Sequence, residues 1–111
     1  MAEATMFAEG NVIDYTPGGA LAAGEVVALA GFVGIAKRAT AAAEPAALAI
    51  RGLFKVGKQT GVAWTRGDII YWVDASNFAN KTAGGNTRMG IAERDAASGD
   101  TTGYVLVYPN L

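Results

Sequence analysis

The sequence predicts an all-β protein, a small single-domain β-barrel or β-sandwich formed by residues 1–111. Two observations support this fold class. Fifteen glycines punctuate the chain, and the apolar runs between them are mostly short and rich in β-branched and aromatic residues, as in strands. The length suits one domain, because a chain of this size buries roughly 65% of its unfolded surface.

Seven strands with short connections are predicted, an arrangement typical of a barrel or sandwich. In chain order they are residues 12–15, 25–29, 32–39, 47–56, 68–73, 88–94 and 104–108. Turns are predicted at residues 16–19, 30–31, 83–85 and 98–100, where turn-forming residues gather. The segment before the first strand, residues 1–11, is predicted to be an extended arm.

The Ala-rich stretch over residues 36–50 has two interpretations. Its helix propensity alone favours a helix. Pro45 lies inside it, however, and a proline within a helix costs about 3 kcal/mol. Since Glu44 followed by Pro45 also suits a turn, we expect strand, turn and strand. A short helix that ends before Pro45 is the alternative.

Two parts of the chain resemble each other. AAGEVVAL (residues 22–29) is followed by GIAKRA (residues 34–39), and TRGDIIYW (residues 65–72) is followed by GIAERDA (residues 90–96). The second interval is longer by thirteen residues. The pattern predicts two similar units that pack into one core, and coincidence is the alternative at this length.

Composition excludes several classes of chemistry. The chain contains no cysteine and no histidine, which excludes disulfides, Cys/His zinc sites and Ser-His-Asp or Cys-His catalysis. Nine basic and ten acidic residues give a net charge of −1, so no overall field attracts nucleic acid or anionic lipid. We expect no metal, no cofactor and no enzymatic activity.

The N-terminal region resembles neither a signal peptide nor a membrane span. Glu3 and Glu9 lie where a signal peptide is basic. No apolar run approaches the ~20 residues that a membrane helix needs. We expect a soluble chain, made in the cytoplasm.

Residues 52–60, GLFKVGKQT, approach the phosphate-loop pattern G-x-x-x-x-G-K-[ST]. Gln59 replaces the hydroxyl residue that would bind magnesium, and strand-like residues follow instead of a helix. Asp74, the carboxylate of a possible Walker B strand, lies sixteen positions after Lys58, too close for a helix and a parallel crossover between them. We therefore expect a strand and a turn at Gly57, with Lys55 and Lys58 solvated or reaching towards solvent. A nucleotide hydrolase is the less favoured alternative.

A set of basic and aromatic residues suggests single-stranded nucleic-acid binding as a further alternative, because bases stack on aromatic side chains. Its members are Lys55, Lys58, Trp64, Arg66, Tyr71 and Trp72. Strand alternation puts Trp72 on the face of Ile70, so at least one aromatic side chain is expected in the core. Residues 95–103, which contain two aspartates, are expected to form a polar hairpin turn, not a calcium loop.

Both ends of the chain carry candidate contact residues. Met6 and Phe7 lie in the polar, Ala-rich arm, which cannot bury them by itself. Near the other end, alternation places Tyr104 and Tyr108 with Leu106 on one side of a strand whose other side is also apolar. A central strand or a subunit interface would explain this pattern. We predict self-contact or partner contact at Met6, Phe7, Tyr104 and Tyr108.

The order of these motifs resembles a family of small bacteriophage and prophage proteins, the capsid decoration or cement proteins, often labelled as predicted RecA/RadA-type recombinases. The resemblance covers nearly the whole chain and rests on turn glycines and strand residues. The matching segments are DYTP (14–17), AGEVV (23–27), GLFKV (52–56) followed by Lys58, GDIIYW (67–72) and GIA (90–92).

The resemblance implies a β-rich, non-catalytic structural protein that self-associates, a trimer being favoured over a dimer. Its partner would be the major capsid protein, of the HK97 fold, on the outer surface of the assembled head. The protein would be made in the host bacterial cytoplasm and reside on the virion. The Ala-rich residues 39–49 and the aromatic, proline-bearing C-terminus depart from the family pattern.

Overall fold

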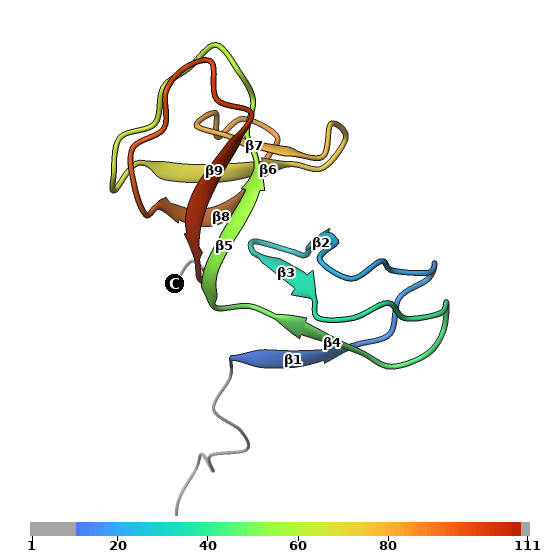
Figure 1. Cartoon of the computed structure of the whole chain (residues 1–111). Coiled ribbons are helices and arrows are strands. Elements are labelled where there is room, and N and C mark those ends of the chain that lie inside the picture. Colours follow the sequence, from blue (N-terminus) through green and yellow to red (C-terminus); the bar gives the residue numbers. More distant parts are fainter. Residues whose placement is uncertain (1–10, 110–111) are drawn as a thin grey trace, which may run out of the picture.

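The computed structural model describes residues 11–109, which form nine strands and no helix (Figure 1). The strands are β1 (Val12–Tyr15), β2 (Val26–Ala28), β3 (Val33–Ala36), β4 (Ala46–Ala49), β5 (Gly52–Gly57), β6 (Ile69–Val73), β7 (Phe78–Asn80), β8 (Thr87–Ala92) and β9 (Thr102–Val107). They form two antiparallel sheets, in the orders β1-β4-β3-β2 and β5-β9-β8-β6-β7. The all-β prediction is confirmed.

The second sheet curls without closing into a barrel. Its edge strands β5 and β7 approach at one isolated parallel bridge, between Lys58 and Ala79. The N–H of Gln59 also donates to the Ala79 carbonyl at 3.0 Å. No continuous ladder joins these edges within residues 11–109, so the architecture is two sheets and not one closed barrel.

The predicted strand over residues 47–56 is wrong in one respect, because it is two strands in different sheets. β4 ends at Ala49 and β5 begins at Gly52, where the chain turns from the lower sheet to the upper one (Figure 1). Gly52 has a φ of 143°, a conformation that side chains with a Cβ rarely adopt. The short strand β7 was not predicted at all.

The Ala-rich segment forms strand, turn and strand, as expected, and contains no helix. Ala46, directly after Pro45, begins β4. Within the turn, Ala43 adopts a φ of 64° and its N–H donates to the carbonyl of Pro17 at 2.9 Å. The turn is therefore held by the loop that follows β1.

The two sheets confirm the internal repeat. We call residues 12–49 the first half and residues 52–107 the second half. The order β1-β4-β3-β2 of the first half matches β5-β9-β8-β6 of the second, and β7 lies in the longer interval of the second half. The registers also match, the equivalent pairs being Val26–Ile35 with Ile69–Ile91, Val27–Gly34 with Ile70–Gly90, and Ile13–Leu48 with Phe54–Val105.

The loops of the two halves repeat the same hydrogen bonds. Gly24 and Gly67 open the turns at φ of 83° and 93°, values at which glycine is unstrained. In front of each turn, one residue exchanges two backbone hydrogen bonds with the loop after the Gly-Ile-Ala strand. These pairs are Leu21–Thr40 in the first half and Trp64–Ala96 in the second. The similarity therefore extends to residues whose side chains differ.

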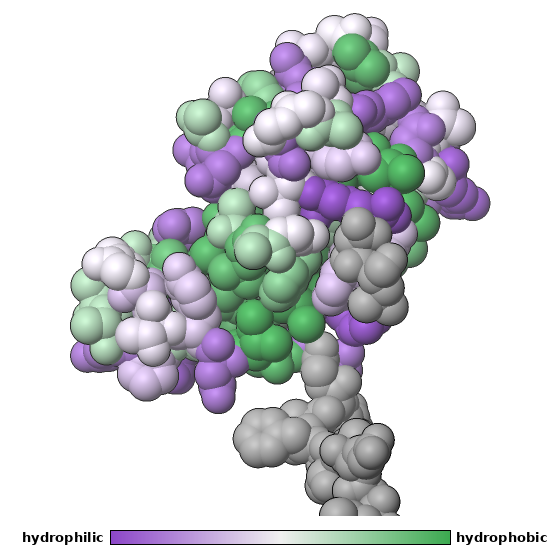
Figure 2. Space-filling model, turned by 180° about the vertical axis from the view of Figure 1, so that it is seen from behind, coloured by the Kyte–Doolittle hydropathy of each residue, from purple (hydrophilic) through white to green (hydrophobic). Residues whose placement is uncertain are grey.

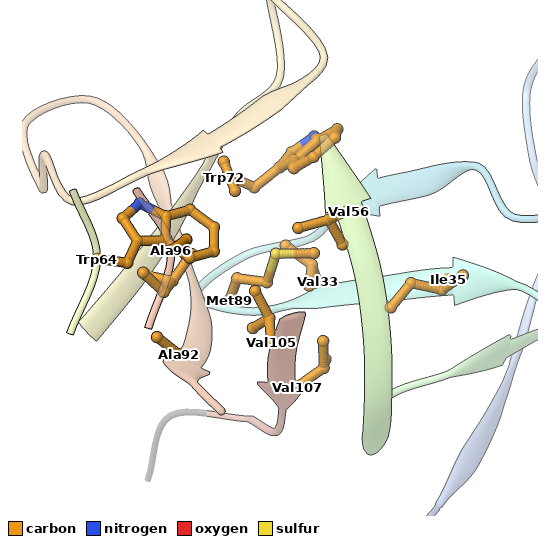
Figure 3. Close-up of a cluster of buried hydrophobic side chains, with 12 residues drawn as sticks. Val33, Ile35, Val56, Trp64, Trp72, Met89, Ala92, Ala96, Val105 and Val107 are labelled. Carbon is orange, nitrogen blue, oxygen red and sulfur yellow. The ribbon is translucent and has the colours of Figure 1, made fainter. Parts of the chain in front are cut away.

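The main core lies in the second half, and strand β3 of the first half closes it. Its members are Val33, Ile35, Val56, Trp64, Ile70, Trp72, Ala79, Met89, Ala92, Ala96, Val105 and Val107. Figure 3 shows Val33 of β3 among Met89, Val105 and Val56 of the second half. A smaller core, formed by Leu21, Ala36, Ala46 and Leu48, lies on the other face of the first sheet. The halves are thus joined by packing as well as by the chain.

Asp68 is expected to stabilise its turn at neutral pH but not in acid. Its Oδ2 accepts the N–H of Thr65 at 2.8 Å and contacts the Lys81 ammonium at 3.0 Å. The backbone hydrogen bond from Thr65, and then Lys81, hold the pKa of Asp68 below its ordinary value of 3.8. Because the pKa is lowered by folding, this stabilisation is complete above 3.8 and is lost as the pH falls through the folded-state pKa.

Asp68→Asn should therefore lower the melting temperature modestly at neutral pH, and the difference from the parent protein should close in acid. Thermal denaturation of both proteins over this pH range measures the effect. Asp14→Asn, which changes an exposed carboxylate on β1, is the control and should melt like the parent protein. An undiminished difference in acid would assign the effect to something other than the charge of Asp68.

Candidate functional site

The segment that resembles a phosphate loop is a strand. Residues 52–57 form β5 and pair with β9 along their whole length, from Gly52–Val107 to Gly57–Thr102. A phosphate loop needs backbone N–H groups that point together at an anion. Here the backbone is extended and belongs to a ladder. The strand interpretation is confirmed, and the geometry of a nucleotide site is not present at these residues.

Lys58 is buried, contrary to the expectation that it is solvated. Its side chain is only 4% exposed. The ammonium donates to the carbonyl oxygens of Gln59 at 3.1 Å and Asp100 at 3.5 Å, and lies 5.8 Å from the centre of the Trp64 ring. Hydrogen bonds to carbonyls and contact with an aromatic face compensate in part for the hydration that a buried ammonium loses. Lys58 thus links the loop after β5 to the loop before β9. Lys55 is exposed, as expected.

The prediction that part of the basic and aromatic set belongs to the core is confirmed, and little of the alternative stacking platform remains accessible. Trp64 and Trp72 are 2% and 6% exposed and belong to the main core, so neither ring offers a free face to a base. Arg66 is exposed, but its Nε donates to the Glu93 carbonyl at 2.8 Å. Tyr71 is half-buried on β6. Only the basic groups of Lys55 and Arg66 remain accessible, too little for a stacking surface.

The aspartates of residues 95–103 serve turns. The N–H of Ala97 donates to Asp100 Oδ2 at 2.9 Å, and the N–H of Asp100 donates to the Ala97 carbonyl at 3.0 Å. Asp95 accepts the N–H of Arg66 at 2.8 Å. The hairpin-turn prediction is confirmed. Within residues 11–109, no three acidic side chains gather into a possible metal site.

Tyr104 and Tyr108 are both half-buried and both lie against an arginine. The guanidinium of Arg94 is 4.0 Å from the centre of the Tyr104 ring. Arg88 Nη2 donates to the Tyr108 hydroxyl at 3.0 Å, and the guanidinium lies 5.7 Å from that ring. The Nε of Arg88 is buried and has no acceptor among the described residues. Each tyrosine is therefore held in place by a cation.

Strand β9 is central in its sheet, with β5 on one side and β8 on the other. Its two faces differ in burial. Val105 and Val107 are 0% and 3% exposed, whereas Leu106 is 39% exposed. Among the described residues, the outer face is thus only partly covered. Met6 and Phe7 lie outside the described residues.

The two halves form two lobes, and a cleft of about 390 Å³ lies between the first sheet and β5 beside their packed contact. Its lining residues are Gly24, Val26, Ile35, Ala36, Lys37, Ala49, Phe54, Lys55 and Val56. On the face shown in Figure 2, apolar residues gather at the junction between the lobes, and polar residues are scattered over the lobes themselves. The polar side chains that line this cleft are those of Lys37 and Lys55, with no carboxylate or hydroxyl among its lining residues.

A family model described as phage cement protein matches residues 7–107. The chain belongs to the phage cement protein family. Membership indicates a structural, capsid-associated role on the phage particle. Neither a search of curated proteins nor a search of solved structures found a match.

The family assignment agrees with the resemblance found in the sequence. In the structure of this cement protein, the matching motifs form strands and turns. GIA occurs twice, and its two copies pair with GEVV in β2–β3 and with GDII in β6–β8. Within residues 11–109, no helix is long and apolar enough to cross a membrane.

Proposed function

We propose that this cement protein binds the outer surface of the assembled phage head and stabilises the lattice of a major capsid protein with the HK97 fold. It acts without catalysis. The observation that carries the proposal is the family match over residues 7–107. The protein is made in the host bacterial cytoplasm and resides on the outside of the virion.

Many weak contacts suit this role better than one strong contact. A single interface of about 800 Å² per partner gives moderate affinity. A homo-oligomer that engages several capsid subunits multiplies such contacts through effective concentration, and we favour a trimer over a dimer. The absence of cysteine supports the role, because the protein then needs no particular redox environment outside the cell.

We propose that Met6, Phe7, Tyr104 and Tyr108 make contacts with the capsid or with another copy of this chain. Aromatic and arginine side chains dominate the binding energy of interfaces, and each of the two tyrosines lies against an arginine. The Nε–H of Arg88, without an acceptor among the described residues, can donate to a carboxylate or carbonyl of the partner next to Tyr108. Met6 and Phe7 supply apolar contact from the arm.

Purified protein mixed with undecorated heads should attach saturably and raise the temperature at which the heads disrupt. Co-sedimentation gives the stoichiometry and the dissociation constant. Because a tyrosine at an interface centre often contributes about 2 kcal/mol or more, which is about 30-fold in the dissociation constant, Tyr104→Ala with Tyr108→Ala should weaken attachment by at least about 30-fold. Val62→Ala, at an exposed loop position, is the control and should bind normally.

Lack of saturable attachment by the parent protein would reject the proposal. Normal attachment of the tyrosine variant would move the contact to other residues and leave the capsid-binding role in place.

A further inference from the structure

An apolar row crosses the outer face of the five-stranded sheet. Its members lie directly opposite one another on four neighbouring strands, and we call them the outer row: Leu53 on β5, Leu106 on β9, Ile91 on β8 and Ile69 on β6. Leu53, Leu106 and Ile69 are 49%, 39% and 42% exposed, and Ile91 is half-buried. Contiguous apolar surface of this kind marks a contact site.

The internal repeat shows what such a row binds. The equivalent row of the first half is Val12, Ala49, Ile35 and Val26. Here Ile35 is only 5% exposed and belongs to the main core of the second half, and Val26 packs against the same core. Ile35 and Val26 of the first-half row are therefore packed on the second half, and Val12 at its end is 39% exposed. Among the described residues, three of the four members of the outer row are exposed.

The surface that receives the first-half row is the inner face of the second sheet. Phe54, Val56, Ile70 and Trp72 contribute to it. The equivalent positions in the first half are Ile13, Tyr15, Val27 and Leu29, which we call the first-half inner face. All four are apolar or aromatic and only partly buried against the small core. The described chain packs no counterpart of the outer row on them.

We propose that the outer row of one copy docks on the first-half inner face of a second copy. The contact between copies then repeats the contact between halves within one chain. The contact is head-to-tail, because two different surfaces meet. Such contacts build a closed ring when the rotation from each copy to the next adds up to a full turn. The proposal specifies the self-association surface of the proposed function, but it does not require capsid binding.

The mass of the purified protein in solution, without phage heads, tests the contact. The parent protein should be an oligomer. The double variant I69D/L106D should associate about 100-fold more weakly, because association would bury two carboxylates against the apolar first-half inner face. Val62→Asp is the matched control, because Val62 is 52% exposed but lies outside the row. Circular dichroism confirms that the variants, changed only at exposed side chains, remain folded.

Two single-cysteine variants test the head-to-tail geometry, because the chain has no other cysteine. Ile35 and Val56 line the same cleft within one chain, so Ile91 of one copy should face Tyr15 of another. Under oxidising conditions, I91C mixed with Y15C should form a disulfide-linked dimer, and each variant alone should not. A monomeric parent protein, an undiminished mass for I69D/L106D, or linkage of I91C alone would overturn the proposal. If I69D/L106D lost binding to phage heads but kept the mass of the parent oligomer, the outer row would be a capsid contact, and the proposal would again be overturned.

Discussion

Gly90→Ala is expected to destabilise the protein by about 3 to 5 kcal/mol, at the upper end of the range for a single substitution. A Cβ at this position would lie 1.9 Å from the carbonyl oxygen of Leu106 and 2.9 Å from its carbonyl carbon. These atoms belong to the backbone of β9, which pairs with β8 through Gly90 and Val107. Relief requires the two central strands to separate, and their hydrogen bonds would be lost.

The repeat provides a graded comparison for this substitution. At the equivalent Gly34, an added Cβ would lie 2.9 Å from both Cβ and Cδ1 of Leu48, a smaller overlap than the 1.9 Å at Gly90. Gly34→Ala should therefore cost about 1 to 2 kcal/mol. At Gly99, nothing lies within 4 Å, so Gly99→Ala is the control.

Denaturant unfolding gives the three free energies, and the expected order of cost is Gly90, then Gly34, then Gly99. Equal costs at Gly90 and Gly99 would show that the close approach of β8 and β9 is not needed.

Gly103→Ala and Trp64→Leu are each expected to destabilise the protein, and the double variant should cost less than their sum. A Cβ on Gly103 would lie 2.3 Å from the Trp64 ring, an overlap that costs about 1 to 3 kcal/mol. Trp64→Leu empties part of the main core and should cost about 2 to 4 kcal/mol. With the smaller leucine present, the alanine Cβ has room.

The first half shows that this exchange of volume works. Leu21 and Ala46 occupy the positions equivalent to Trp64 and Gly103, and both are buried in the small core. A double-mutant cycle in denaturant should give a favourable coupling of about 2 kcal/mol. Additive free energies would mean that the ring and the glycine do not constrain each other.

The sequence alone determined the local architecture. Glycine turns, β-branched runs and Pro45 favoured extended strands over a short helix within residues 36–50, because these preferences act between residues close in the chain. The same local patterns predicted the repeat, whose registers Val26–Ile35 and Ile69–Ile91 are equivalent. They also showed that residues 52–60 do not form a phosphate loop.

Other features had no local signal. The apolar run over residues 47–56 is continuous in sequence, yet it changes sheet between Ala49 and Gly52. The short strand β7 is fixed by pairing with β6. Lys58 looked like a surface lysine, and only the approach of the loop that contains Asp100 buries it.

The difference between the outer row and its first-half equivalent was decided by the tertiary structure. Alternation along a strand determines which side chains share a face. It places Leu106 on one face of β9 and Val105 and Val107 on the other. Whether a face is buried depends on what packs against it, and that partner is distant in sequence. Ile35 is covered because β3 closes the core of the second half, whereas its equivalent Ile91 stays half-buried, because no similar unit packs on it among the described residues.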